Sequence, residues 1–200
     1  LCLLAYQPCP AQPPSEEEFD WVGERFFPVF EELFPIEERL GYSLGYRSYR
    51  DLYTDELEYS FVFNRDPRNQ DLTAVLRIAD SASIYDQIMN LHRKDKTASI
   101  DAIKPKLKVK EWRFSDKTCP TVRRQYDEFY RLSLQTLSAK DRAEQAKGVA
   151  TIILHPRVHI IKADISGGDV RMVLSDPQHP FVRWAERTKR ALEKCVVKQN

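Results

Sequence analysis

Three histidines and one aspartate in the last quarter of the chain are the side chains with the widest chemical range in this sequence. His155 and His159 are four residues apart, and Asp164 and His179 follow them. Imidazoles ligate zinc and act as general bases, and a carboxylate such as that of Asp164 orients an imidazole ring. On an unbroken strand the two nearer histidines are about 13 Å apart, so only a bulge at Pro156 would let them share a metal ion. These residues define a hydrolase or metal-enzyme hypothesis. Their spacing matches no specific motif, however, and we predict no cofactor and no metal.

The cysteines Cys119 and Cys195 offer a second kind of chemistry with more than one interpretation. Cys119 stands at the expected start of a helix, beside Lys117, and both features favour a reactive thiolate. In an oxidising compartment Cys119 and Cys195 would instead form a disulfide that closes a loop of about 77 residues. Cys195 also fits the interpretation of a buried apolar residue. We favour the disulfide, because no cysteine stands at redox-motif spacing from Cys119.

Lysines and aromatic rings supply two candidate binding surfaces. Lysines occupy every second position from Lys104 to Lys110, so an extended strand would place four ammonium groups on one face. Such a face binds an anionic partner, or it forms a solvated edge strand that resists aggregation between sheets. Rings outside the apolar stripe of the first helix would line a groove for an apolar ligand, or pack in the core. The candidate binding residues are Trp21, Phe27, Lys106, Lys108, Lys110 and Trp112.

The overall charge excludes some classes of partner and suggests another. The chain of 200 residues has 31 basic and 30 acidic side chains, so no global field attracts it to nucleic acid or to a membrane, and we expect no nucleic-acid partner. No stretch is long and apolar enough to span a bilayer. Residues 15–39 contain nine acidic and two basic residues, whereas residues 181–200 contain six basic and two acidic ones. The two ends therefore suit a contact with each other, within one chain or across a homodimer.

The periodicity of apolar residues predicts the elements that must position these side chains. Alternation with period two indicates strands, and spacings of three and four residues indicate helices. The order α-βββ-α-β-α-ββ-α predicts an α+β fold, with a mainly antiparallel sheet of about five to six strands packed against about four helices. The expected helices lie near residues 15–41, 81–92, 118–137 and 180–195, the expected strands near 42–47, 57–64, 72–79, 106–114, 149–163 and 170–174, and a hairpin turn lies at 166–169.

The three strands between residues 42 and 79 allow a prediction of which side chains face the core. Turn residues separate these strands closely, so an antiparallel meander with one buried face is expected. One set of alternating residues should face the core and the other set the opposite side. The core set is Leu57, Tyr59, Phe61, Phe63, Leu72, Leu76 and Ile78, and the opposite set includes Glu58, Ser60 and Arg77.

The first residues suggest where the protein works. Residues 1–11 combine an apolar run with the segment Cys9-Pro10-Ala11, as at the end of a signal peptide whose start is missing. We therefore expect a single domain over residues 12–200, exported to the periplasm or the extracellular space. The sequence favours a non-catalytic binding or interaction domain for an apolar or anionic ligand. The alternative is the hydrolase or metal-dependent enzyme built on the His155, His159, His179 and Asp164 set.

Overall fold

The computed structural model describes residues 26–36, 42–50, 57–136, 157–165 and 168–197. The expected signal-peptide segment 1–11 and the candidate residue Trp21 lie outside these ranges. After a helix over residues 26–33, the elements are β1 (Tyr42–Arg50), β2 (Tyr59–Arg65), β3 (Leu72–Ala79), α2 (Ile84–Lys94), α3 (Ile100–Ile103), the 3-10 helix η1 (Lys104–Lys106), β4 (Val109–Ser115), α4 (Thr121–Thr136), β5 (Arg157–Ile165), β6 (Gly168–Leu174) and α6 (Pro180–Val196).

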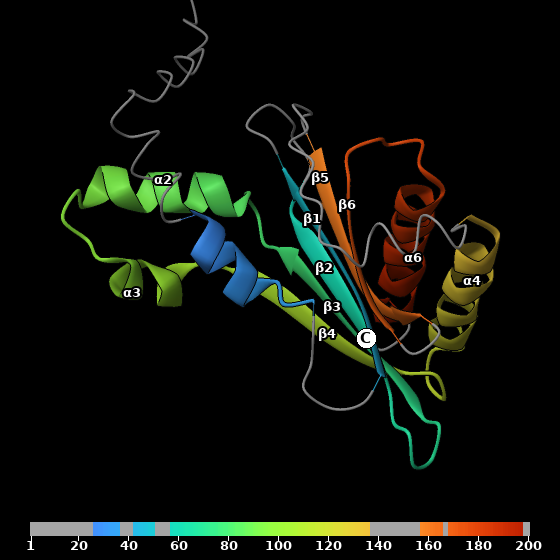
Figure 1. Cartoon of the computed structure of the whole chain (residues 1–200). Helices are drawn as coiled ribbons and strands as arrows, with labels where there is room; N and C mark the ends of the chain where they lie inside the picture. The colour runs from blue at the N-terminus through green and yellow to red at the C-terminus, as the bar shows by residue number, and fades with distance from the viewer. Residues whose placement is uncertain (1–25, 37–41, 51–56, 137–156, 166–167, 198–200) are drawn as a thin grey trace, which may run out of the picture.

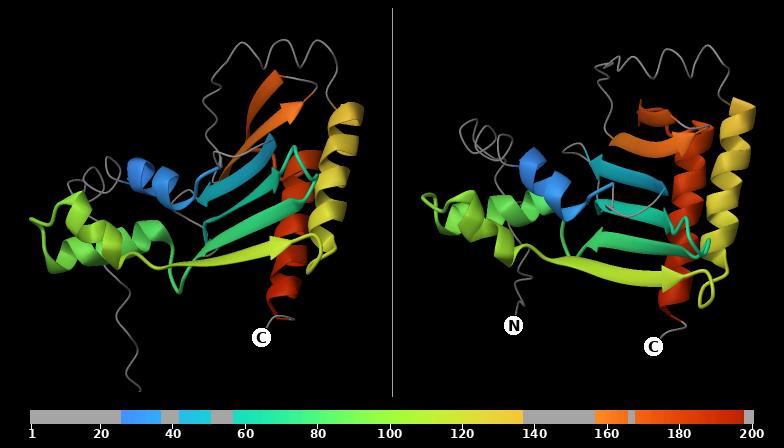
Figure 2. Two further views of the ribbon diagram at one scale, coloured as in Figure 1. Left: turned by 90° about the horizontal axis from the view of Figure 1, so that it is seen from below. Right: turned by 60° about the horizontal axis from the view of Figure 1, so that its bottom comes forward.

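Six antiparallel strands form one sheet in the order β4-β3-β2-β1-β5-β6. The predicted α+β class and the predicted order of elements are confirmed. Ile165 pairs with Gly168, so β5 and β6 form a hairpin as predicted. Gly168 and Asp169, which were predicted to belong to the turn, already lie in β6. Figures 1 and 2 show α4 and α6 on one side of the sheet, with the 26–33 helix, α2 and α3 on the other.

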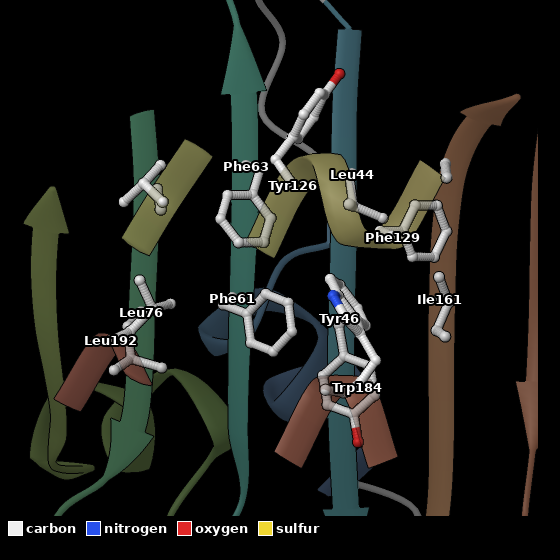
Figure 3. Close-up of a cluster of buried hydrophobic side chains, with 14 of the residues drawn as sticks. Leu44, Tyr46, Phe61, Phe63, Leu76, Tyr126, Phe129, Ile161, Trp184 and Leu192 are labelled. Carbon is white, nitrogen blue, oxygen red and sulfur yellow. The ribbon is translucent and has the colours of Figure 1, made fainter. Parts of the chain in front are cut away.

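The larger core lies between the sheet and the helices α4 and α6. Aromatic side chains dominate it: Phe61 and Phe63 of β2 meet Trp184 of α6 with ring centroids 5.5 and 6.5 Å apart, and Phe129 of α4 lies 5.0 Å from Trp184 (Figure 3). Trp184 also donates its indole N–H to the carbonyl of Gln125 at 3.0 Å, which satisfies the one polar atom of that ring. These contacts hold α6 against both the sheet and α4.

A second core covers the opposite face, so the expectation of a single buried face was wrong. The segment 26–34 contributes Phe26, Phe30 and Phe34 to this core, and α2 contributes Ile84 and Ile88. Polar residues of β2 and β3, and one just before β2, are buried as well: Glu58, Ser60 and Arg77 are at most 9% exposed. Leu57 precedes β2 and packs on this second core rather than the first.

Two helix and strand boundaries differ from the predicted ones for local reasons. The helix expected from about residue 81 begins at Ile84, because Ser83 is the N-cap of α2 and its hydroxyl accepts a hydrogen bond from the Asp86 amide at 3.0 Å. Lys104–Lys106 form a 3-10 turn around Pro105, and β4 starts only at Val109. The four alternating lysines therefore do not share one strand.

The cysteine pair forms the predicted disulfide. Cys119 and Cys195 are joined with an S–S distance of 2.02 Å and a Cα–Cα distance of 6.0 Å. The bond ties the residue just before α4 to the last turn of α6. It therefore reinforces the pairing of the two helices that Trp184 also supports.

Loss of the disulfide should destabilise the protein without changing its fold. The bond spans 76 positions, and the chain-entropy model assigns roughly 4 kcal/mol to the closure of such a loop. Cys119→Ser/Cys195→Ser should therefore unfold at lower urea concentration by about that free energy. Alkylation of the native wild type without reductant, read out by peptide mapping, should leave Cys119 and Cys195 unmodified. Ready alkylation of these two cysteines would contradict the assignment.

His179 should make the stability of the protein depend on pH. It is the N-cap of α6, where its Nδ1 accepts from the Phe181 amide at 3.3 Å, a role that only an unprotonated Nδ1 can fill. Burial lowers the pKa of His179 from 6.5, and Asp176 opposes this shift. The unfolded chain therefore binds the proton first, so stability is complete above pH 6.5 and is lost as pH falls from there to the lower folded pKa.

His179→Asn is the matched control, because asparagine caps helices well and does not titrate. Urea denaturation of both proteins from pH 8 to pH 5 should show the wild type losing stability relative to the variant on acidification. Parallel profiles, or a wild type that gains stability in acid relative to the variant, would contradict the role assigned to His179.

Candidate functional site

Two cations face each other on the last hairpin of the sheet. Lys162 of β5 pairs directly with Arg171 of β6, and Gly45 of β1 lies on the other side of Lys162. Like charges at directly opposite positions destabilise a sheet. Arg171 is exposed and makes no ion pair with any described residue. The hairpin thus brings two cations to directly opposed positions on neighbouring strands.

Gly45 lets another segment approach the sheet beside this pair. A Cβ atom on Gly45 would lie 1.8 Å from the carbonyl oxygen of Ile36, far inside van der Waals contact. Only glycine therefore allows the backbone after the 26–33 helix to lie directly on β1. This contact sets the position of Pro35 and Ile36 next to Lys162.

A pocket of about 350 Å³ opens where these segments meet. Residues from four separate parts of the chain surround it, and three of them are cations against one carboxylate. The lining residues are Glu31, Pro35, Ile36, Arg47, Lys162 and Arg171. The excess of positive charge and the apolar wall of Pro35 and Ile36 suit a ligand with an acidic group.

Arg47 is the most buried charge in the pocket lining, with 4% of its surface exposed. Its Nη2 donates to the carboxylate of Glu31 at 2.7 Å, and its guanidinium lies 5.7 Å from the centre of the Phe30 ring. Its Nε is buried and has no hydrogen-bond partner among the described residues. The Glu31 side chain is 59% exposed, so solvent weakens this ion pair and the carboxylate can exchange with another anion.

The same charged side chains shift the pKa of Tyr49, which lies beside the pocket. Burial raises the pKa of its phenol, Arg47 and Arg171 lower it, and Glu31 raises it. The ring contacts Phe27 and Phe30 edge-on, with centroids 5.5 and 5.6 Å away. Tyr49 therefore stays protonated and anchors the 26–33 helix beside the pocket.

The aromatic residues predicted to bind a ligand do not converge on one site. Phe27 is 51% exposed on the 26–33 helix, whereas Trp112 is half-buried against the core on the opposite face of the sheet.

The predicted lysines are equally dispersed. Lys106 lies in η1 and Lys108 just before β4, while Lys110 pairs with Asp80 at 2.7 Å. All three are exposed. No described contact links these lysines to Phe27.

The histidines of the enzyme hypothesis have separate structural surroundings. His159 is 1% exposed, and its Nδ1 lies 2.5 Å from the Tyr46 hydroxyl inside the larger core. Tyr46 continues this polar chain to Tyr59, which donates to Glu186 of α6 at 2.9 Å. His179 caps α6. His155 and the side chain of Asp164 lie outside the described residues, and the described part of the chain contains no cluster of metal-ligating side chains.

Sequence reasoning missed the pocket. The turn predicted at 166–169 does not give the observed register, in which Lys162 of β5 pairs with Arg171 of β6. The contribution of Arg47 and Gly45 had no local signal, because it depends on how the 26–36 segment packs.

Comparison with known proteins adds no family to this description. No protein-family model matches the chain, and no curated protein or solved structure matches it significantly. Within the described residues, no helix has the length and apolar character needed to cross a membrane. The function is therefore inferred from the residues of the pocket.

Gly45→Ala should destabilise the protein and disturb the pocket. The added methyl group meets a backbone carbonyl, which cannot rotate away, and overpacking of this kind costs about 1–3 kcal/mol. Denaturant unfolding should show this loss, and Thr73→Ala at an exposed position of β3 should show almost none. A Gly45→Ala protein as stable as the wild type would mean that Ile36 does not lie on β1.

Proposed function

We propose that this chain is a non-catalytic binding domain that holds the acidic group of a ligand in the pocket between the 26–33 helix and strands β1, β5 and β6. The observation that carries the proposal is the convergence of Arg47, Lys162 and Arg171 around one cavity. These residues come from three strands, and the cost of placing two of them directly opposite each other is offset when an anion binds.

The chemistry of the lining defines the ligand group. Arginine and lysine side chains bind carboxylate and phosphate oxygens through charge-assisted hydrogen bonds, which are about twice as strong as neutral ones. With Glu31 in place, the four charged groups sum to +2. A phosphate ester or a polycarboxylate meets that charge better than a single carboxylate does. Pro35 and Ile36 would contact the less polar part of the ligand.

The disulfide supports the exported location that we propose for this domain. Disulfides persist in oxidising compartments and are rare in the cytosol, and Cys119 and Cys195 are joined. A hydrolase centred on His159 finds less support, because the ring is buried and already bonded to Tyr46. A substrate would have to displace the core to reach it.

Removal of the hairpin cations should abolish anion binding. In Lys162→Gln/Arg171→Gln, the dissociation constants for inorganic phosphate and for citrate should rise at least about tenfold, which corresponds to about 1.4 kcal/mol. Isothermal titration calorimetry measures the constants. Amide shifts of Gly45, Lys162 and Arg171 in nitrogen-15 NMR spectra locate the site.

The matched control is Lys110→Gln/Arg113→Gln, which removes the same charge from exposed positions of β4. It should change the dissociation constants less than twofold. Equal weakening of binding by both variants would mean that only the net charge of the protein matters, which would contradict a specific site. If neither phosphate nor citrate bound saturably, the proposal would be overturned. Native mass spectrometry of protein purified from its own host should reveal a retained acidic ligand.

A further inference from the structure

The outer face of α6 bears a straight line of cations. Arg183, Arg187, Arg190 and Lys194 follow each other at intervals of four, three and four residues, and all four are exposed. At about 3.6 residues per turn these intervals place them within about 60° of arc, along about 16 Å of the helix axis. The opposite side of α6 packs on the core through Phe181, Trp184, Thr188 and Leu192. We call these four cations the α6 stripe.

The α6 stripe works against the stability of its own helix. Its three successive pairs are like charges at spacings of three or four residues, and such pairs destabilise a helix. Arg183 lies near the N-terminus of α6, where the helix dipole disfavours a cation. Glu186 and Glu193 flank the stripe, at three or four residues from Arg183 and Arg190, so they offset part of this repulsion. The like-charge pairs within the stripe remain a cost to the helix.

Little of the stripe is neutralised within the chain. Arg187 pairs with Glu128 of α4 at 2.6 Å, and Arg190 donates to the backbone carbonyl of Glu186. Among the described residues, Arg183, Arg190 and Lys194 make no ion pair with a carboxylate. The disulfide at Cys195 fixes the end of α6 to α4, so the stripe is presented on a rigid support.

We propose that the α6 stripe is the binding surface for a linear acidic polysaccharide outside the cell. A row of arginines and a lysine about 16 Å long matches an extended chain with acidic groups at regular intervals, because each cation then meets a separate anion. This surface lies on the face of the sheet opposite the pocket (Figure 1), so the two sites can be tested separately.

Two other polyanions fit the stripe less well. A helix that lies on a membrane inserts an apolar face into the lipid, but the apolar face of α6 is buried in the core. Single-stranded nucleic acids bind where exposed aromatic rings stack on the bases, and the described residues of α6 expose no aromatic ring. Of these three classes, an acidic polysaccharide, which offers charges along an extended chain, fits the stripe best.

Binding to heparin, used as the acidic polysaccharide probe, tests the inference. Wild-type protein should be retained on a heparin column, and Arg183→Gln/Arg190→Gln/Lys194→Gln should elute at clearly lower salt, with an affinity for soluble heparin at least tenfold weaker. The control Lys106→Gln/Lys108→Gln/Lys110→Gln loses the same charge from exposed positions in η1, before β4 and in β4. It should elute close to the wild type.

A single charge reversal separates binding from folding. Arg190→Glu turns the repulsive pairs with Arg187 and Lys194 into attractive ones, and the attractive pairs with Glu186 and Glu193 into repulsive ones. Because these changes oppose each other, its melting temperature should stay close to that of the wild type, while its heparin affinity falls. Lack of retention of the wild type, equal loss in both triple variants, or unchanged heparin binding by Arg190→Glu would each overturn the proposal. Tighter binding to phosphatidylglycerol vesicles or to single-stranded DNA than to heparin would overturn it as well.

Discussion

Helices on both faces of the sheet bury the polar side chains of its central strands, and the rest of the structure depends on how those side chains are satisfied. One cross-strand row shows the solution: Arg47, Ser60, Arg77 and Glu111 lie side by side on β1 to β4. Arg77 donates to Glu111 at 2.7 Å at one end of this row. At the other end, Arg47 donates a hydrogen bond to the carboxylate of Glu31, which lies outside the sheet. Because a buried cation without a partner is costly, Arg47 helps to hold the 26–33 helix on this face.

The position of the pocket follows from the same arrangement. The 26–33 helix anchors its aromatic residues in the second core, and the chain then crosses β1 at Gly45, where no side chain blocks its path. Strands β5 and β6 continue the sheet beyond that crossing. Their outward cations, Lys162 and Arg171, therefore stand at the border between a covered and a less covered part of the sheet, and a pocket forms at that border.

The sequence predicted the features of the fold that depend on local periodicity, which are the strands and helices. It did not predict the features that depend on how the layers pack together. The alternation of residues 59–63 and the turn residues at 166–169 give the strands, and helical spacing gives α2, α4 and α6. The sequence around Ser60 and Arg77 does not indicate that these residues face a second layer of helices, because a polar residue in an alternating strand normally faces solvent. The lysines at 104–110 misled for a related reason: their alternation mimics a strand, but Pro105 places Lys104 and Lys106 in a 3-10 turn. The binding residues were therefore sought where cations alternate, not where they oppose each other.

Opposition of like charges links the two surfaces that we assign to binding. The chain has almost equal numbers of basic and acidic side chains, so its cations have enough potential partners. Exposed ion pairs such as Lys110–Asp80 and Lys117–Asp71 show that carboxylates do neutralise lysines elsewhere on the surface. At Lys162–Arg171 and along the α6 stripe, by contrast, cations stand next to cations. Such like-charge pairs cost folding free energy. An anion bound at either place would lessen that repulsion, and this is the physical link between the two surfaces.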